Sequence, residues 1–264
     1  MIKTGSVTIE NHEIHYEWIN PKLIDEGKPV IIFLHHGLGS IKQWGKFPER
    51  ISNLMQCPAL VYDRLGYGKS SAFTQACDSR YLHYEALTML PQLIEKLNIT
   101  NKIILFGHSD GATIVLIYAA HHSEKLIAVV SEAPHVIIEE VSISGIKDSI
   151  NDYENGVLKP LLTKYHNEKT DLMFYGWALT WTNVLQKDWN IIEEMATITT
   201  PVMVIYGDKD EYGTLEQINV IKKAVKTKVE AAIINNCAHF PHKEKEEEVT
   251  TIVVDFLKKM ALDI

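Results

Sequence analysis

One stretch of the chain reads Phe106-Gly107-His108-Ser109-Asp110-Gly111-Ala112, a Gly-x-Ser-x-Gly element. The apolar run 103–106 before it predicts a buried strand, and the run 112–120 after it, apolar almost all round, predicts a buried helix. A serine at such a strand–turn–helix junction occupies a tight, strained turn that projects its hydroxyl above the sheet edge. The helix also points backbone N–H groups at nearby negative charge. We therefore predict that Ser109 is a nucleophile.

The strands of the fold are predicted from apolar patterning. Period-two alternation on both sides of the Asn11-His12 turn predicts an antiparallel hairpin with one wet face. Besides 103–106, short unbroken apolar runs predict strands buried on both faces. These runs are Val30–Leu34, Ala59–Tyr62, Ile127–Val130, Val202–Tyr206 and Ala231–Ile234. The expected fold class is α/β, with a mostly parallel eight-stranded sheet, an antiparallel N-terminal hairpin and helices on both faces.

Two segments between the strands have distinct characters. Apolar residues at helical spacing from Leu82 to Leu97 predict an amphipathic helix, with a kink or an early end at Pro91. From residue 132 to residue 200 no buried strand is evident, and three of the five tryptophans lie there. We expect a helical cap inserted after the sixth strand at 132–200, over a core domain formed by 1–131 and 201–264. The alternative is that these helices simply pack on the core.

The composition limits the partners and the compartment. The 264 residues include 26 basic and 34 acidic side chains, a net charge of −8, which argues against nucleic acid or an anionic membrane as partner. Eleven acidic residues and five lysines put −6 of this charge in the expected cap. The three cysteines, Cys57, Cys77 and Cys237, suggest free thiols in a reducing compartment. No apolar run is long enough for a signal peptide or a membrane span, so we expect a cytoplasmic protein, monomeric or homodimeric.

A base and an acid for the serine are found near the C-terminus. His239 follows the last predicted strand, in a loop at the edge of the sheet that also carries Ser109. The strand Val202–Tyr206 ends in Gly207-Asp208-Lys209-Asp210. The chain order is then serine, aspartate, histidine, the order of hydrolases with a nucleophile elbow. A serine hydroxyl needs such a base, and the base needs an orienting acid.

With these motifs the chain resembles the α/β-hydrolase fold superfamily over essentially its whole length. The resemblance also rests on His36-Gly37-Leu38-Gly39 and on Asp63-Arg64-Leu65-Gly66-Tyr67-Gly68-Lys69-Ser70. It implies that Asp210, the second aspartate of its element, is the acid. It further implies an oxyanion hole formed by the backbone N–H groups of Leu38 and Asp110.

Other residues have alternative interpretations. Asp208 is expected to form a turn, and Glu132, after the sixth strand, is the other position at which this fold can carry its acid. His242 lacks the strand-end position. We expect His35, His36 and His108 to pack in the floor of the site, and Asp63 and Arg64 to form a turn and an ion pair. The twelve histidines suggest no metal cluster, and we expect neither a metal nor a cofactor.

The side chain of Asp110 is open to two interpretations. Next to the nucleophile, a carboxylate would raise the pKa of His239 and favour a substrate with a nearby cation, such as an amino-acid ester. Alternatively, it caps the following helix, whose N-terminus favours negative charge.

The sequence predicts a cofactor-independent serine hydrolase that acts on a small, fairly apolar carboxylic ester. Ser109 would attack the carbonyl, His239 would move the proton and Asp210 would fix the imidazole tautomer. A serine at the elbow argues against dehalogenases and epoxide hydrolases, whose nucleophile in this fold is a carboxylate. We expect Trp44, Trp177 and Trp181 to line the substrate pocket. Hydrolysis of an amide, thioester or carbon–carbon bond by the same triad remains open, as does a ligand sensor with slow turnover.

Overall fold

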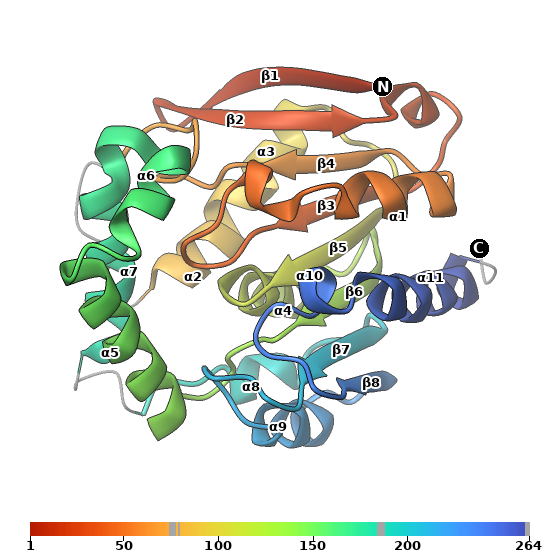
Figure 1. Cartoon of the computed structure of the whole chain (residues 1–264). Coiled ribbons are helices and arrows are strands. Elements are labelled where there is room, and N and C mark those ends of the chain that lie inside the picture. The colour runs from red at the N-terminus through yellow and green to blue at the C-terminus, as the bar shows by residue number, and fades with distance from the viewer. Residues whose placement is uncertain (74–77, 79, 184–187, 262–264) are drawn as a thin grey trace.

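A single eight-stranded sheet runs through the computed structural model, which describes residues 1–73, 78, 80–183 and 188–261 (Figure 1). The strands follow the order β1-β2-β4-β3-β5-β6-β7-β8. β2 pairs antiparallel with β1 and with β4, and all other pairs are parallel, which confirms the predicted fold class. The strands are β1 (Ile2–Ile9), β2 (His12–Ile19), β3 (Val30–Leu34), β4 (Ala59–Tyr62), β5 (Ile103–His108), β6 (Leu126–Glu132), β7 (Val202–Gly207) and β8 (Val229–Ile234).

Helices cover both faces of this sheet (Figure 1). Successive residues of β3 enter different apolar clusters: Ile32 packs on the face covered by α3 and α4, and Phe33 on the face covered by α1 and α11. This is why the strand is an unbroken apolar run. The helices are α1 (Phe47–Met55), α2 (Tyr81–Tyr84), α3 (Leu90–Lys96), α4 (Asp110–His121), α5 (Glu140–Glu154), α6 (Lys159–His166), α7 (Thr170–Thr182), α8 (Ile192–Met195), α9 (Glu216–Ala224), α10 (Pro241–Glu244) and α11 (Glu246–Ala261).

The helix predicted from Leu82 to Leu97 is interrupted earlier than expected. A π-helical turn, Glu85–Met89, separates α2 from α3, and Pro91 lies in the first turn of α3. Proline is well tolerated there because the first N–H groups of a helix have no intrahelical partner. The irregularity therefore precedes Pro91.

Three of the helices between β6 and β7 stand together at one end of the sheet, and another, α8, packs against α4 and α9. Figure 1 shows α5, α6 and α7 beyond the ends of the central strands. Within this group, the rings of Tyr153 from α5 and Phe174 from α7 stack with centroids 3.8 Å apart. A helical segment thus follows the sixth strand, and its division from the core at residues 132 and 200 remains a prediction.

Two further observations bear on the environment of the chain. Among the described residues, no helix combines the length and the apolar character that crossing a bilayer requires. Cys57 and Cys237 are buried free thiols, and Cys77 lies outside the described residues.

Close packing of glycines fixes the turn between β5 and α4. Ser109 has a φ of 54°, a left-handed conformation that L residues rarely adopt. A Cβ on Gly107 would lie 2.0 Å from the carbonyl oxygen of Gly111, and one on Gly111 would lie 2.0 Å from that of Leu34. Only glycine therefore lets α4 approach the ends of β5 and β3 so closely.

Replacement of Gly111 by alanine tests this packing. Because the new Cβ would meet the backbone of Leu34, we expect Gly111→Ala to lower the free energy of unfolding by about 3 kcal/mol. Urea denaturation measures the change. Gly27→Ala is the control: its Cβ meets nothing within 4 Å at a φ of +72°, so backbone strain of about 1 kcal/mol is its only cost. Equal effects of the two substitutions would contradict the packing argument.

Candidate active site

A cavity of about 210 Å³ lies at the carboxyl ends of the parallel strands, where ligands bind in open α/β sheets. Ser109 and His239 both line it, although they are 130 positions apart in the chain. Trp177 and Trp181 line it as predicted. The remaining lining residues are His36, Gly37, Leu38, Gln43, Asp110, His135, Ser142, Ile146, Ser149, Leu158, Leu162, Tyr212 and Phe240. A larger cavity, about 640 Å³, lies beside Arg64 and Tyr84 and has neither Ser109 nor His239 in its lining.

The nucleophile elbow is tied to the neighbouring strand. The backbone N–H of Ser109 donates to the carbonyl of Glu132, at the end of β6, over 2.9 Å. The carbonyl of Ser109 accepts from the N–H of Thr113 and so begins α4. The Ser109 side chain is thereby held at the start of a buried helix, on the wall of the cavity.

His239 and Asp210 form a buried pair. The Nδ1 atom of His239 lies 2.8 and 3.0 Å from the two carboxylate oxygens of Asp210. Burial alone would raise the pKa of Asp210, but the charge of His239 and its hydrogen bond outweigh this and leave the pKa below its ordinary value. Burial likewise opposes a charged His239, yet Asp210 raises the pKa of the imidazole above its ordinary value of 6.5. The predicted acid–base contact is therefore present.

The carboxylate of Asp110 already has partners within the protein. Its Oδ2 lies 3.4 Å from a guanidinium nitrogen of Arg64 and accepts a 2.7 Å hydrogen bond from the Tyr81 hydroxyl. The indole N–H of Trp181 donates to that same hydroxyl. Burial raises the pKa of Asp110, with Arg64 opposing the shift. The residue at the cap position of α4 is Ser109, and no side chain caps it. Asp110 is thus neither a helix cap nor a free partner for a substrate cation.

The Leu38 turn also lines the cavity. The N–H of Leu38 points to Nδ1 of His36 over a long 3.3 Å, and the N–H of Gly39 donates to the carbonyl of His36. A Cβ on Gly37 would lie 2.3 Å from Nε1 of Trp177 in α7. Leu38 and Asp110, the residues expected to supply oxyanion donors, therefore line the same cavity as Ser109.

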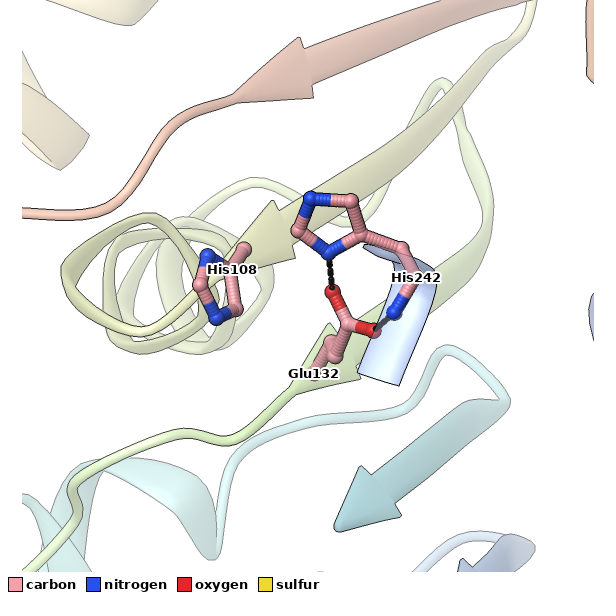
Figure 2. Close-up of side chains that lie close together, drawn as sticks. All are labelled: His108, Glu132 and His242. Carbon is pink, nitrogen blue, oxygen red and sulfur yellow. Dashed lines mark hydrogen bonds and ion pairs between the residues drawn. The ribbon is translucent and has the colours of Figure 1, made fainter. Parts of the chain in front are cut away.

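A second buried histidine–carboxylate pair lies beside the first. Figure 2 shows the Glu132 carboxylate directed at His242, whose Nδ1 lies 2.6 Å away and whose backbone N–H donates to the other oxygen over 2.7 Å. His108 stands beside them, and its Nε2 donates to the carbonyl of His239 over 2.7 Å. Glu132 therefore pairs with His242 and not with His239. The residue at the alternative position for the acid is thus not the partner of His239.

The same three residues are the candidate metal ligands within the described part of the chain. Their ligand atoms all lie within 4.8 Å of one another, closer than the sequence suggested. However, both oxygens of Glu132 already accept hydrogen bonds from His242. Hydrogen bonds join Glu132 to His242, and His108, which donates to the carbonyl of His239, places the trio in the floor of the site.

The structure places Trp44 outside the cavity, contrary to expectation. It ends a short 3₁₀ turn, Ile41–Trp44, and packs against Phe33 and His242 with ring centroids 5.5 and 4.7 Å away. This position lies under the sheet edge, on the face covered by α1 and α11. The 3₁₀ turn after Gly39 buries Ile41 and Trp44 in this same apolar cluster, which the sequence position alone did not reveal.

The remaining expected residues have structural contacts. His35 accepts the N–H of Arg64 at Nε2, and the carboxylate of Asp63 accepts the N–H groups of Ile41 and Lys69. The carboxylate of Asp208 accepts the N–H of Cys237. These are the turn and packing roles that the sequence suggested.

Sequence reasoning missed two aromatic groups of the site. Tyr81 reaches Asp110 from α2, and His135 lies in the loop after β6 with its ring centroid 5.8 Å from that of His239. Burial lowers the pKa of His135 to about 4, so it is neutral near pH 7. Neither residue belongs to a motif, and only the fold brings His135 to the cavity and Tyr81 to Asp110.

Comparisons with known proteins agree with this fold. The model of the alpha/beta hydrolase fold matches residues 29–149. Proline iminopeptidase of Saccharolobus solfataricus is 22% identical over 239 residues, 76% of this chain and 76% of the relative. Epoxide hydrolase 3 of Xenopus tropicalis is 22% identical over 293 residues, 97% of this chain and 78% of the relative.

A solved structure shares the whole fold. A membrane phospholipase A, described as a bacterial virulence factor, superposes with a TM-score of 0.81 at 20% identity, over 98% of this chain and 87% of that chain. At this identity the likeness concerns the fold and not the substrate. The family model, the strand order and the shared architecture agree, and the chain has the α/β-hydrolase fold.

Proposed function

We propose that the protein is a serine hydrolase that cleaves a small, uncharged carboxylic ester. The observation that carries this proposal is that Ser109, on its strained elbow, and His239, paired with Asp210, open onto one small cavity. A nucleophile and a base on one cavity, with an acid that orients the base, are the parts that acyl transfer needs.

The proposed reaction proceeds through an acyl-enzyme. The Ser109 hydroxyl attacks the ester carbonyl while Nε2 of His239 takes its proton. Asp210 holds the Nδ1–H of the imidazole and stabilises the imidazolium that forms. The N–H groups of Leu38 and Asp110 bind the oxyanion, and His239 returns the proton to the leaving alcohol. Water, activated by His239, then releases the acid and restores Ser109.

The size and the lining of the cavity favour a small, neutral substrate. Its volume of about 210 Å³ is below the roughly 300 to 1,000 Å³ of drug-sized ligand pockets. Trp177, Ile146 and Leu162 contribute apolar surface, and Asp110 is engaged by Arg64 and Tyr81. The relatives include a peptidase and an epoxide hydrolase, but Ser109 stands where epoxide hydrolases of this fold carry a carboxylate.

A substrate panel tests the proposal. We expect p-nitrophenyl acetate and butyrate to be hydrolysed with a kcat/KM at least tenfold above that of the laurate, because the longer chain exceeds the cavity. Ser109→Ala is the blank, with an expected loss of about 10⁴-fold or more. The panel includes an amide, a thioester and a β-diketone. Preference for one of these over esters would contradict the ester assignment, and negligible turnover of all of them would favour a sensor.

The pH dependence tests the role of the buried pair. His239 acts as a base only when neutral and its pKa is raised above 6.5, so we expect kcat/KM to fall as the pH falls through a value above 6.5. Asp210→Asn removes the charge that raises this pKa. It should lower kcat by about 10³- to 10⁴-fold and move the acid limb of the profile to lower pH.

Asp208→Asn is the matched control for this substitution. Asp208 lies two residues earlier and accepts the N–H of Cys237 instead of a histidine, so the profile should stay unchanged. If Asp208→Asn reproduced the effect of Asp210→Asn, the assignment of the acid would be wrong.

Asp110→Asn tests whether this carboxylate recognises substrate. Because Arg64 and Tyr81 occupy it, we expect the ratio of kcat/KM for an α-amino ester and its uncharged analogue to stay unchanged. Breaking the buried pair should lower the free energy of unfolding by about 3 kcal/mol. Asp78→Asn, in an exposed pair with Arg80, is the control and should cost less than about 1 kcal/mol. Selective loss of activity on the amino ester would show instead that Asp110 binds the cation.

A further inference from the structure

A buried histidine of α6 contacts the turn that carries Leu38. His166, the last residue of α6, has no exposed surface. Its Nε2 lies 3.2 Å from the carbonyl oxygen of Leu38, and its Nδ1 lies 3.0 Å from the backbone nitrogen of Gly68. A carbonyl only accepts and a backbone N–H only donates, so the ring is neutral with its proton on Nε2. Both ring nitrogens are thus used to join α6 to two loops of the sheet edge.

The tautomer is consistent with the surroundings of the ring. Burial lowers the pKa of His166 to about 4, with the Leu38 contact opposing the shift and Lys169 adding to it. Protonation would place a second N–H against the N–H of Gly68. The neutral form, which satisfies both partners, therefore predominates near pH 7.

Lys169, three residues after His166, attaches the end of α6 to the sheet edge at a different place. Its Nζ donates to the carbonyls of Tyr67 and Gly68 over 3.2 and 2.7 Å, and also to that of Ser70. None of these contacts involves the Leu38 turn. Lys169 and His166 thus both attach this segment to the sheet edge, but only His166 contacts Leu38.

The Leu38 turn depends on such external contacts. It lies outside the helices and strands, with glycines on both sides of Leu38. Its own bond from the Leu38 N–H to His36 is long, at 3.3 Å. Trp177 packs against Gly37 on one side of Leu38, and His166 holds the carbonyl on the other. Both contacts come from the helices between β6 and β7.

We propose that His166 is a positioning residue for the oxyanion hole. By holding the carbonyl of Leu38, it fixes the conformation of the turn and so the place of the Leu38 N–H, whose long bond to His36 would give way to the substrate oxygen. The helical segment after β6 therefore completes the catalytic machinery in addition to covering the cavity. This inference rests on the proposed function, because it assumes that the Leu38 N–H binds an oxyanion.

Two substitutions of His166 separate its two hydrogen bonds. In His166→Gln the side-chain amide nitrogen can replace Nε2 and keep the donor to Leu38. In His166→Asn the amide oxygen can replace Nδ1 and keep the acceptor for Gly68, but the donor to Leu38 is lost. We expect His166→Asn to lower kcat by about 10- to 100-fold with KM within about twofold of wild type, as for a misplaced oxyanion donor. His166→Gln should keep kcat within about threefold of wild type.

Lys169→Met is the matched control. It removes three contacts between the same segment and the sheet edge but leaves the Leu38 turn intact. We expect lower stability to urea and a kcat within about threefold of wild type. If His166→Asn does not fold, His166→Met replaces it, since it also lacks the donor and carries the same expectation for kcat.

Three outcomes would overturn the proposal. They are equal losses of kcat in His166→Gln and His166→Asn, a loss in Lys169→Met as large as that in His166→Asn, and an unchanged kcat in His166→Asn. Each of these leaves the proposed function standing if wild-type ester hydrolysis still depends on Ser109. Wild-type protein without Ser109-dependent turnover would overturn both.

Discussion

The close approach of α4 to the ends of β5 and β3 is the constraint on which the rest of the site depends. Gly107 and Gly111 permit it, because a Cβ at either position would overlap a backbone carbonyl. The approach forces Ser109 into a left-handed conformation and places its side chain on the cavity wall. It also brings the end of β3, and therefore the Leu38 turn, next to the start of α4. One packing contact thus sets the relative position of the proposed nucleophile and oxyanion donors.

Buried charges around this turn occur in pairs. Asp210 faces His239, Glu132 faces His242, and Asp110 faces Arg64, and all six side chains are nearly or completely buried. An unpaired buried charge costs several kcal/mol, so each partner is needed for the other to be tolerated. The three pairs have different roles in the site. Only the first combines a raised histidine pKa with a place beside Ser109, while the second lies beneath it and the third fixes Asp110.

Much of the fold could be predicted from the sequence because it depends on local patterns. Unbroken apolar runs and a period-two hairpin identified the eight strands, and the Gly-x-Ser-x-Gly turn located the elbow. His239 followed from its position just after a strand, since the carboxyl ends of parallel strands share one edge. The choice of Asp210 as the acid came from the resemblance to the α/β-hydrolase fold superfamily. The contact between Asp210 and His239 is present in the structure.

Other features could not be predicted because distant segments create them. Trp44 was expected to line the substrate pocket but packs on the face covered by α1 and α11, in a turn whose direction no local pattern fixes. The partner of Asp110 is Arg64, 46 positions away, and His166 lies 128 positions from Leu38. The burial of a single histidine produces no periodic pattern in the sequence. A buried histidine that joins two loops therefore looks the same in the sequence as a histidine on the surface.

The central claim is that Ser109 is an activated nucleophile, and covalent labelling tests it most directly. Folded wild-type protein is treated with a fluorophosphonate, and the intact mass and the modified peptide are then determined by mass spectrometry. An activated Ser109 predicts one label per chain, located on Ser109, and no labelling after denaturation. A folded protein that stays unlabelled at Ser109, or that is labelled elsewhere, would contradict it.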